Sequence, residues 1–108
     1  FECSVHPNPS SKGGPFLVAI RREPGATKTV FSYGHGDVIR GQDAQWRSGL
    51  SPWQVVQEGE KLYGRGTADN KGQHTVNIAA LAAVLKARNG KLGFDVVLLI
   101  ETGEEVGS

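Results

Sequence analysis

Apolar positions in this chain form several short runs and one long pattern with helical spacing. Phe16–Ile20 and Phe94–Ile100 are short and almost wholly apolar, and Thr29–Tyr33 is rich in β-branched and aromatic residues. These three segments therefore predict β-strands. Glu60–Tyr63 is a shorter strand candidate. In Asn70–Arg88 the apolar side chains recur every three or four residues, which predicts a helix.

The order of these segments predicts the fold class. A strand, a helix and a second apolar strand follow one another, which is the order of a βαβ unit. Phe94–Ile100 is apolar on both faces apart from Asp95, so we expect a central strand covered on both sides. The alanine-rich helix should pack close to the sheet, and Asn89-Gly90 should end it. We therefore expect an α/β domain with a mixed or mostly parallel central sheet flanked by helices.

The remaining segments give weaker predictions. Residues 1–15 contain three prolines and two adjacent glycines, and we expect them to be irregular. A turn at Arg22–Ala26 separates the first two predicted strands, so Thr29–Tyr33 should form a hairpin with Phe16–Ile20 or lie near it. Gly34–Pro52 is expected to be a loop.

Composition and charge limit the kinds of binding partner and cellular location that we expect. The chain has 108 residues, 38% hydrophobic and 21% charged, as in an ordinary globular domain. A net charge of +1 predicts neither nucleic acid nor a membrane surface as partner. No apolar run approaches the roughly 20 residues of a membrane helix. The single cysteine, Cys3, cannot form an internal disulfide, which favours a reducing, cytoplasmic location. Because the chain lacks methionine, Phe1 is not a native start, and a targeting segment could precede it.

Polar residues with metal-binding chemistry follow the predicted strands or begin the predicted helix. His35 comes directly after Thr29–Tyr33 and its glycine neighbour, and Glu104 and Glu105 follow Phe94–Ile100. Asp69 stands at the start of the helix. In open α/β sheets, ligands collect beyond the carboxyl ends of the strands. If the two strands are parallel neighbours, all these side chains lie on one rim of the sheet.

Each residue also has a plainer interpretation. A neutral imidazole is a common zinc ligand, and Asp37 could accept the second ring N–H of His35. The alternative is a solvated loop histidine beside a turn aspartate. Asp69 could bridge two metals, or it could be only the N-cap of the helix. His74, inside the helix, is expected to be a surface or packing residue.

The adjacent carboxylates Glu104 and Glu105 also allow two interpretations. In extended backbone, neighbouring side chains point in opposite directions. One carboxylate could then hold a metal while the other faces the substrate as a general base. The alternative is a solvated acidic turn.

Two other function classes stay open. Gly64-x-Gly66 before a helix suggests nucleotide binding, but Asp69 fills the third glycine position and would repel a pyrophosphate. Gly72 is followed by Gln73, so a P-loop is absent as well. A non-catalytic binding module on the same fold is the second alternative.

Taken together, the motifs resemble the M20 family of metallopeptidases and deacylases. The resemblance covers about three quarters of the chain. Its motifs are Gly34-His35-Gly36-Asp37-Val38, then Trp46 and Pro52-Trp53, then Gly64-Arg65-Gly66-Thr67-Ala68-Asp69-Asn70-Lys71-Gly72, and finally Glu104-Glu105-Val106-Gly107-Ser108.

The resemblance implies a zinc-dependent amide hydrolase with two Zn²⁺ ions, for which Co²⁺ or Mn²⁺ are alternatives. By motif position, His35 would bind one zinc, Asp69 would bridge both, and Glu105 would bind a zinc. Glu104 would be the general base, and Asp37 would orient His35. The implied substrate is an N-acyl amino acid or a short peptide.

The resemblance also implies how the chain relates to a larger protein. Residues 1–108 would be the N-terminal part of the catalytic domain, truncated at both ends and lacking the lid or dimerisation domain. A further carboxylate and a further histidine downstream would complete the metal site. The resemblance also implies that the parent protein could be a homodimer. Asn70-Lys71-Gly72 slightly favours the dipeptidase-type members.

Overall fold

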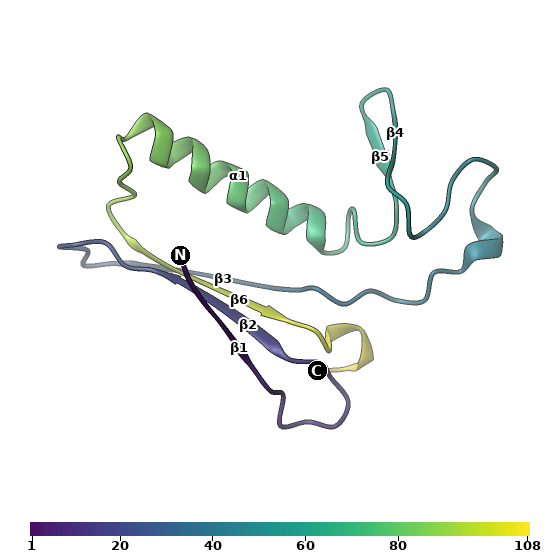
Figure 1. Ribbon diagram of the computed structural model, residues 1–108, viewed down its shortest axis with the longest axis horizontal. Coiled ribbons are helices and arrows are strands. Elements are labelled where there is room, and N and C mark those ends of the chain that lie inside the picture. Colours follow the sequence, from purple (N-terminus) through teal and green to yellow (C-terminus); the bar gives the residue numbers. More distant parts are fainter.

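A computed structural model describes all residues, 1–108, and contains one principal sheet. Its strand order is β1 (Glu2–His6), β2 (Phe16–Arg21), β6 (Asp95–Glu101) and β3 (Thr29–His35). β2 is antiparallel to both of its neighbours, whereas β3 and β6 are parallel. Figure 1 shows these strands side by side beneath the single long helix. The mixed sheet confirms the expected α/β class.

The helix α1 (Lys71–Ala87) connects the two parallel strands and completes the predicted βαβ unit. Its bounds lie one residue inside the predicted range at each end. Asn89 and Gly90 adopt left-handed backbone angles, with φ of 51° and 84°, so the chain leaves the helix where the sequence predicted. α1 is not long and apolar enough to cross a membrane.

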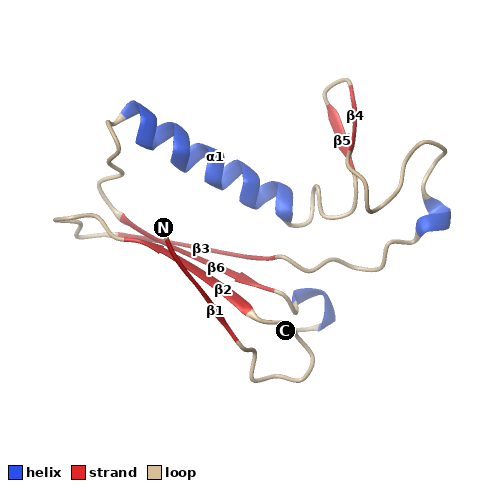
Figure 2. Ribbon diagram, viewed as in Figure 1, coloured by secondary structure: helices blue, strands red, loops and turns tan.

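The prediction that β6 is an interior strand is confirmed, but the prediction that both of its faces are covered is wrong. Leu92 and Val96 are fully buried, yet α1 lies over only one face of the sheet (Figure 2). On the opposite face, Phe31 and Tyr33 of β3 remain 61% and 53% exposed. The molecule is accordingly flat, with extents of 53 × 40 × 16 Å.

The helix also packs less closely on the sheet than its alanines led us to expect. None of its residues is fully buried. An apolar cavity of about 330 Å³ separates α1 from the sheet. Its lining comes from the N-terminal strands, β6 and the helix, and includes Phe1, Leu17, Leu81, Leu85 and Ile100.

One expectation about the N-terminal half is wrong, and the structure decides between the two positions expected for β3. Residues 1–15 are not wholly irregular, because β1 pairs with β2 in a register that runs from Glu2 opposite Ile20 to His6 opposite Phe16. Of the two positions expected for β3, a hairpin with β2 or a place near it, the structure has the second, because β6 lies between the two strands. β6 has a continuous apolar run between Asp95 and Glu101, and an interior position removes more of this surface from water than an edge would.

The segment between β3 and α1 is less regular. It contains a short 3₁₀ turn, η1 (Asp43–Gln45), and a hairpin of β4 (Val56–Glu58) and β5 (Lys61–Tyr63). The strand predicted at Glu60–Tyr63 is confirmed as β5, and β4 was not predicted. Arg47 pairs with Glu58 and lies 5.2 Å above the Tyr63 ring, which holds the loop against the hairpin.

Candidate metal centre

The carboxyl ends of β3 and β6 form the rim on which the candidate site lies. The two strands are in parallel register, with His35 opposite Glu101. Just beyond them, the Gly36 N–H donates to the Glu101 carbonyl at 2.8 Å. The short 3₁₀ helix η2 (Glu104–Val106) follows β6. The parallel pairing on which the predicted site depends is therefore present.

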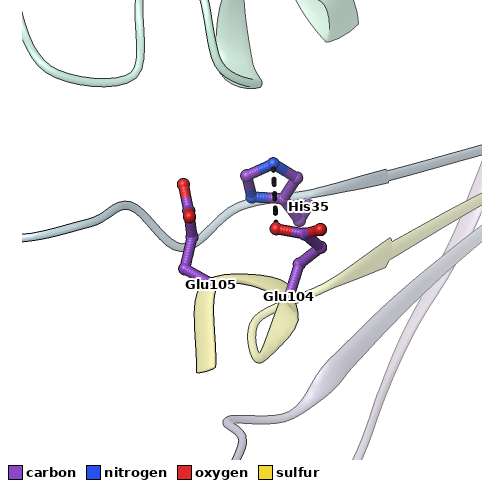
Figure 3. Close-up of side chains that lie close together, drawn as sticks. All are labelled: His35, Glu104 and Glu105. Carbon is purple, nitrogen blue, oxygen red and sulfur yellow. Dashed lines mark ion pairs between the residues drawn. The ribbon is translucent and has the colours of Figure 1, made fainter. Parts of the chain in front are cut away.

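Three of the predicted residues meet at this rim. His35, Glu104 and Glu105 each offer a ligand atom, and these atoms all lie within 4.8 Å of one another. Figure 3 shows both carboxylates beside the imidazole, with a dashed line from Glu104 to His35, and Glu104 Oε2 lies 3.9 Å from His35 Nε2. His35 is buried, at 6% exposure, whereas the Glu104 side chain is 46% exposed.

The prediction that Glu104 and Glu105 lie in extended backbone is wrong. Glu104 and Glu105 lie in η2 and not in extended chain, so their side chains do not point in opposite directions. Residues of a 3₁₀ helix are separated by about 120° around its axis, since three residues make a turn. Both carboxylates can therefore approach one imidazole from neighbouring directions.

Asp69 approaches His35 from the helix side. Its Oδ1 lies 3.0 Å from His35 Nε2, and its side chain is 76% exposed. Asp69 is not part of the group within 4.8 Å, so the structure joins it to the imidazole but not to both glutamates. The N-cap interpretation of Asp69 is wrong, because Asn70 is the capping residue. The peptide bond between Asp69 and Asn70 is cis.

Asp37 joins the histidine to the glutamate turn. His35 Nδ1 lies 3.1 Å from the Asp37 backbone oxygen and 3.3 Å from its Oδ1. The other carboxylate oxygen, Oδ2, accepts the backbone N–H of Glu105 at 3.0 Å. Oδ1 is buried and has no other partner. Asp37 is thus placed to fix both the imidazole plane and the position of η2.

The surroundings of His35 change the acidity of its imidazole. Burial disfavours the charged ring and lowers its pKa. The hydrogen bond to Asp69, the Asp37 carbonyl and the charges of Glu104 and Asp37 act in the other direction, and together they raise the pKa of His35 above its ordinary value of 6.5. The site therefore favours a positive charge at the position of this ring.

Two residues that were not predicted to belong to the site, Asn70 and His74, hold the rim together. The Asn70 side-chain oxygen accepts the His35 backbone N–H at 2.9 Å, and His74 Nε2 lies 3.2 Å from the His35 carbonyl. His74 is therefore more than the surface or packing residue that we expected. The available signal was the spacing of four residues between Asn70 and His74, which places both on one helix face.

A second missed pair lies beside the site. Glu101 is buried at 5% exposure and accepts a hydrogen bond from the Tyr33 hydroxyl. Glu101 ends the apolar strand, but its sequence position alone does not distinguish it from the two glutamates that follow.

The donors at the rim fit a zinc-type ion. Zinc in proteins accepts imidazole nitrogen and carboxylate oxygen at about 2.0–2.2 Å, so two ligands of one ion are separated by at most roughly twice that distance. The group within 4.8 Å is close to this limit, and Asp69 adds a further oxygen beside the imidazole. An imidazole and several carboxylates at the carboxyl ends of parallel strands define a candidate metal centre of an α/β metalloprotein.

Comparison with known proteins identifies the family. The model of peptidase family M20/M25/M40 matches residues 31–108, and the chain belongs to this family. Two similar relatives are a probable di- and tripeptidase, DUG2, of Saccharomyces cerevisiae and a succinyl-diaminopimelate desuccinylase of Novosphingobium aromaticivorans. The first is 39% identical over 82 residues, covering 75% of this chain and 9% of the relative. The second is 38% identical over 91 residues, covering 84% of this chain and 22% of the relative.

A solved structure agrees with this assignment. The M20 family metallo-carboxypeptidase Sso-CP2 of Sulfolobus solfataricus superposes with a TM-score of 0.80 at 29% identity. The alignment covers 99% of this chain and 23% of that protein. The chain thus spans less than a quarter of the length of each of these three proteins.

Proposed function

We propose that this chain carries part of the active site of a metal-dependent hydrolase that cleaves an amide or peptide bond. The observation that carries the proposal is the convergence of His35, Glu104 and Glu105 on one rim, with Asp69 against the same imidazole. Membership of the peptidase family supports the reaction class.

The proposed cofactor is zinc, two ions in the complete site, with Co²⁺ or Mn²⁺ as substitutes. His35 and Glu105 would each hold an ion, and Asp69 would bridge the two. When bound, such ions polarise a carbonyl oxygen and lower the pKa of water. Asp37 keeps the imidazole oriented through its position beside Nδ1 and keeps Glu105 in place by accepting its backbone N–H.

We propose Glu104 as the general base. The Glu104 side chain is more exposed than that of Glu105 and remains open to solvent and substrate. Its carboxylate would remove a proton from the attacking water and deliver that proton to the leaving nitrogen.

The proposed substrate is a small N-acyl amino acid or short peptide. The relatives include a protein named as a di- and tripeptidase and one named as a desuccinylase. Asn70-Lys71-Gly72 favours the dipeptidase type. A nucleotide substrate is disfavoured, because the carboxylate of Asp69 occupies the third glycine position and contacts His35.

We further propose that residues 1–108 are the N-terminal part of the catalytic domain. The lid or dimerisation domain and the remaining ligands would then lie elsewhere in the parent protein, which would form a homodimer. The small share of each relative that the chain covers supports the proposal that it is one part of a larger protein.

The test uses the full-length parent protein and a panel of dipeptides and N-acyl amino acids. Glu104→Ala should abolish turnover and leave the zinc content nearly unchanged, since the base is not a ligand. Asp69→Ala should lose both zinc and activity. Glu60→Ala, at an exposed glutamate of the hairpin turn, is the matched control and should change neither. Wild-type kcat in the Glu104 variant would contradict the proposed role.

A further inference from the structure

The backbone of His35 is held by side chains of α1 and not by a neighbouring strand. β3 is the edge strand of the sheet. Gly36 directs its N–H toward β6, and successive residues of a strand direct their backbone groups to opposite edges. The N–H and C=O of His35 therefore face away from the sheet. Because His35 is buried, both groups need partners.

Asn70 and His74 supply these partners. Asn70 Oδ1 accepts the His35 N–H at 2.9 Å, and His74 Nε2 lies 3.2 Å from the His35 carbonyl oxygen. A carbonyl can only accept, so Nε2 of His74 carries the proton and donates. One helix face thus satisfies both backbone groups of the histidine.

Two local features support this arrangement, the missing capping hydrogen bond of Asn70 and the glycine at position 34. Asn70 is the N-cap residue of α1, yet its side chain makes no capping hydrogen bond, because its oxygen is engaged by His35. Gly34 leaves the space that the two side chains occupy. A Cβ at this position would overlap Asn70 Oδ1 and the ring of His74, coming within 2.7 Å of Nε2. Any other residue at Gly34 would displace the Asn70 carboxamide or the His74 ring from these positions.

The contacts also link the backbone of His35 to Asp69. Asp69 contacts the imidazole at 3.0 Å, and the next residue, Asn70, holds the backbone of the same histidine. The separation between imidazole and carboxylate therefore depends on where Asn70 and His74 place α1 relative to β3.

We propose that Asn70 and His74 are positioning residues that set the geometry of the metal centre by clamping the backbone of His35. Neither is assigned as a ligand. This inference rests on the proposed metal site. Removing either contact should loosen the imidazole relative to Asp69 and weaken zinc binding by about 10–100-fold, as loss of outer contacts to ligands commonly does.

The experiment measures zinc affinity of the full-length protein by competition with a chelating indicator, and the visible absorption spectrum of the Co²⁺-loaded protein. Asn70→Leu and His74→Leu remove one contact each. His74→Gln restores an N–H donor and should recover most of the affinity and the Co²⁺ spectrum. Asn77→Leu makes the same change as Asn70→Leu at an exposed position of α1, and should leave both measurements unchanged.

The outcomes separate the inference from the proposed function. Wild-type affinity and spectrum in both leucine variants, while His35→Ala loses zinc, would overturn the clamp and leave the metal site standing. An equal loss in Asn77→Leu, or no recovery in His74→Gln, would also overturn it. If Asn70→Leu does not fold, the comparison of His74→Leu with His74→Gln alone tests the clamp. Failure of the wild-type protein to bind zinc through His35 would overturn both proposals.

Discussion

At the scale of single residues, Tyr33 and Glu101 form the contact with the clearest titration behaviour. The hydrogen bond from the Tyr33 hydroxyl to the buried Glu101 carboxylate, together with burial and nearby negative charge, raises the pKa of Tyr33 to about 12. Ionised tyrosine would lose this bond and face a carboxylate. The contact therefore stabilises the fold fully below the ordinary tyrosine pKa of about 10, and the stabilisation is lost as pH rises through about 12.

We predict that Glu101→Gln lowers the pKa of Tyr33 toward 10, because the amide carries no negative charge. Phenolate absorbance followed from pH 8 to 13 measures the change, and Tyr33→Phe identifies the signal against that of Tyr63. The same pKa for Tyr33 with and without the Glu101 carboxylate would show that this contact does not govern its acidity.

At the scale of elements, the junction between α1 and β6 holds most of the buried core. Leu92 lies in this connection at 0% exposure, and Val96 follows at 1%. Truncating a buried leucine removes apolar contacts and leaves a cavity, at a cost of about 2–5 kcal/mol. We predict a loss of that size in the free energy of unfolding of the parent protein for Leu92→Ala, measured by urea denaturation.

Leu62→Ala is the control for this prediction. Leu62 lies in β5 and is 59% exposed, so the same substitution there should change stability by no more than about 0.5 kcal/mol. Equal losses at both positions would contradict the assignment of the core to the α1–β6 junction.

The elements that the sequence predicted are those with a strong local pattern. α1 has helical spacing over many residues, and β6 is continuously apolar, so neither depends on a partner to be recognised. β1 and β4 are short and partly polar, and they become strands through pairing with β2 and β5. The order of strands in the sheet is likewise set by contacts between distant segments, which is why the sequence could not decide whether β3 forms a hairpin with β2 or only lies near it.

The candidate site was predictable to a similar extent. His35, Glu104 and Glu105 follow strands, and the parallel pairing of β3 with β6 gathers them. Asp69 precedes the helix and contacts only the imidazole. The 3₁₀ backbone of the glutamate pair was not predictable from alternation. The contacts of Asn70 and His74 depend on how α1 is rotated against β3, which periodicity does not specify.

At the scale of the whole molecule, one face of the sheet is uncovered. Phe31 and Tyr33 are more than half exposed there, and an apolar cavity of about 330 Å³ lies beneath α1 on the other face. Exposed apolar faces of this kind promote association. We predict that a polypeptide of these 108 residues self-associates, and that its sedimentation coefficient rises with concentration. Phe31→Lys should weaken the association, and Val76→Lys, on the exposed side of α1, should not.

The same polypeptide should be catalytically inactive and bind zinc weakly. Three carboxylates gathered near one imidazole repel one another without a metal, and metal binding is normally coupled to folding of its site. The assay is hydrolysis of the dipeptide and N-acyl amino acid panel by the 108-residue polypeptide beside the full-length parent. Metal-dependent turnover by the short polypeptide, after exclusion of contaminating hydrolases, would mean that the site is complete within residues 1–108.

The most direct test of the metal centre is anomalous diffraction at the zinc absorption edge from crystals of the full-length parent protein. We predict density at zinc-ligand distance, about 2.0–2.2 Å, from His35 Nε2, with oxygens of Asp69 and Glu105 also in contact with the bound ions and Glu104 beside them but not bound. Zinc density elsewhere, or an occupied centre that His35 does not contact, would contradict the account.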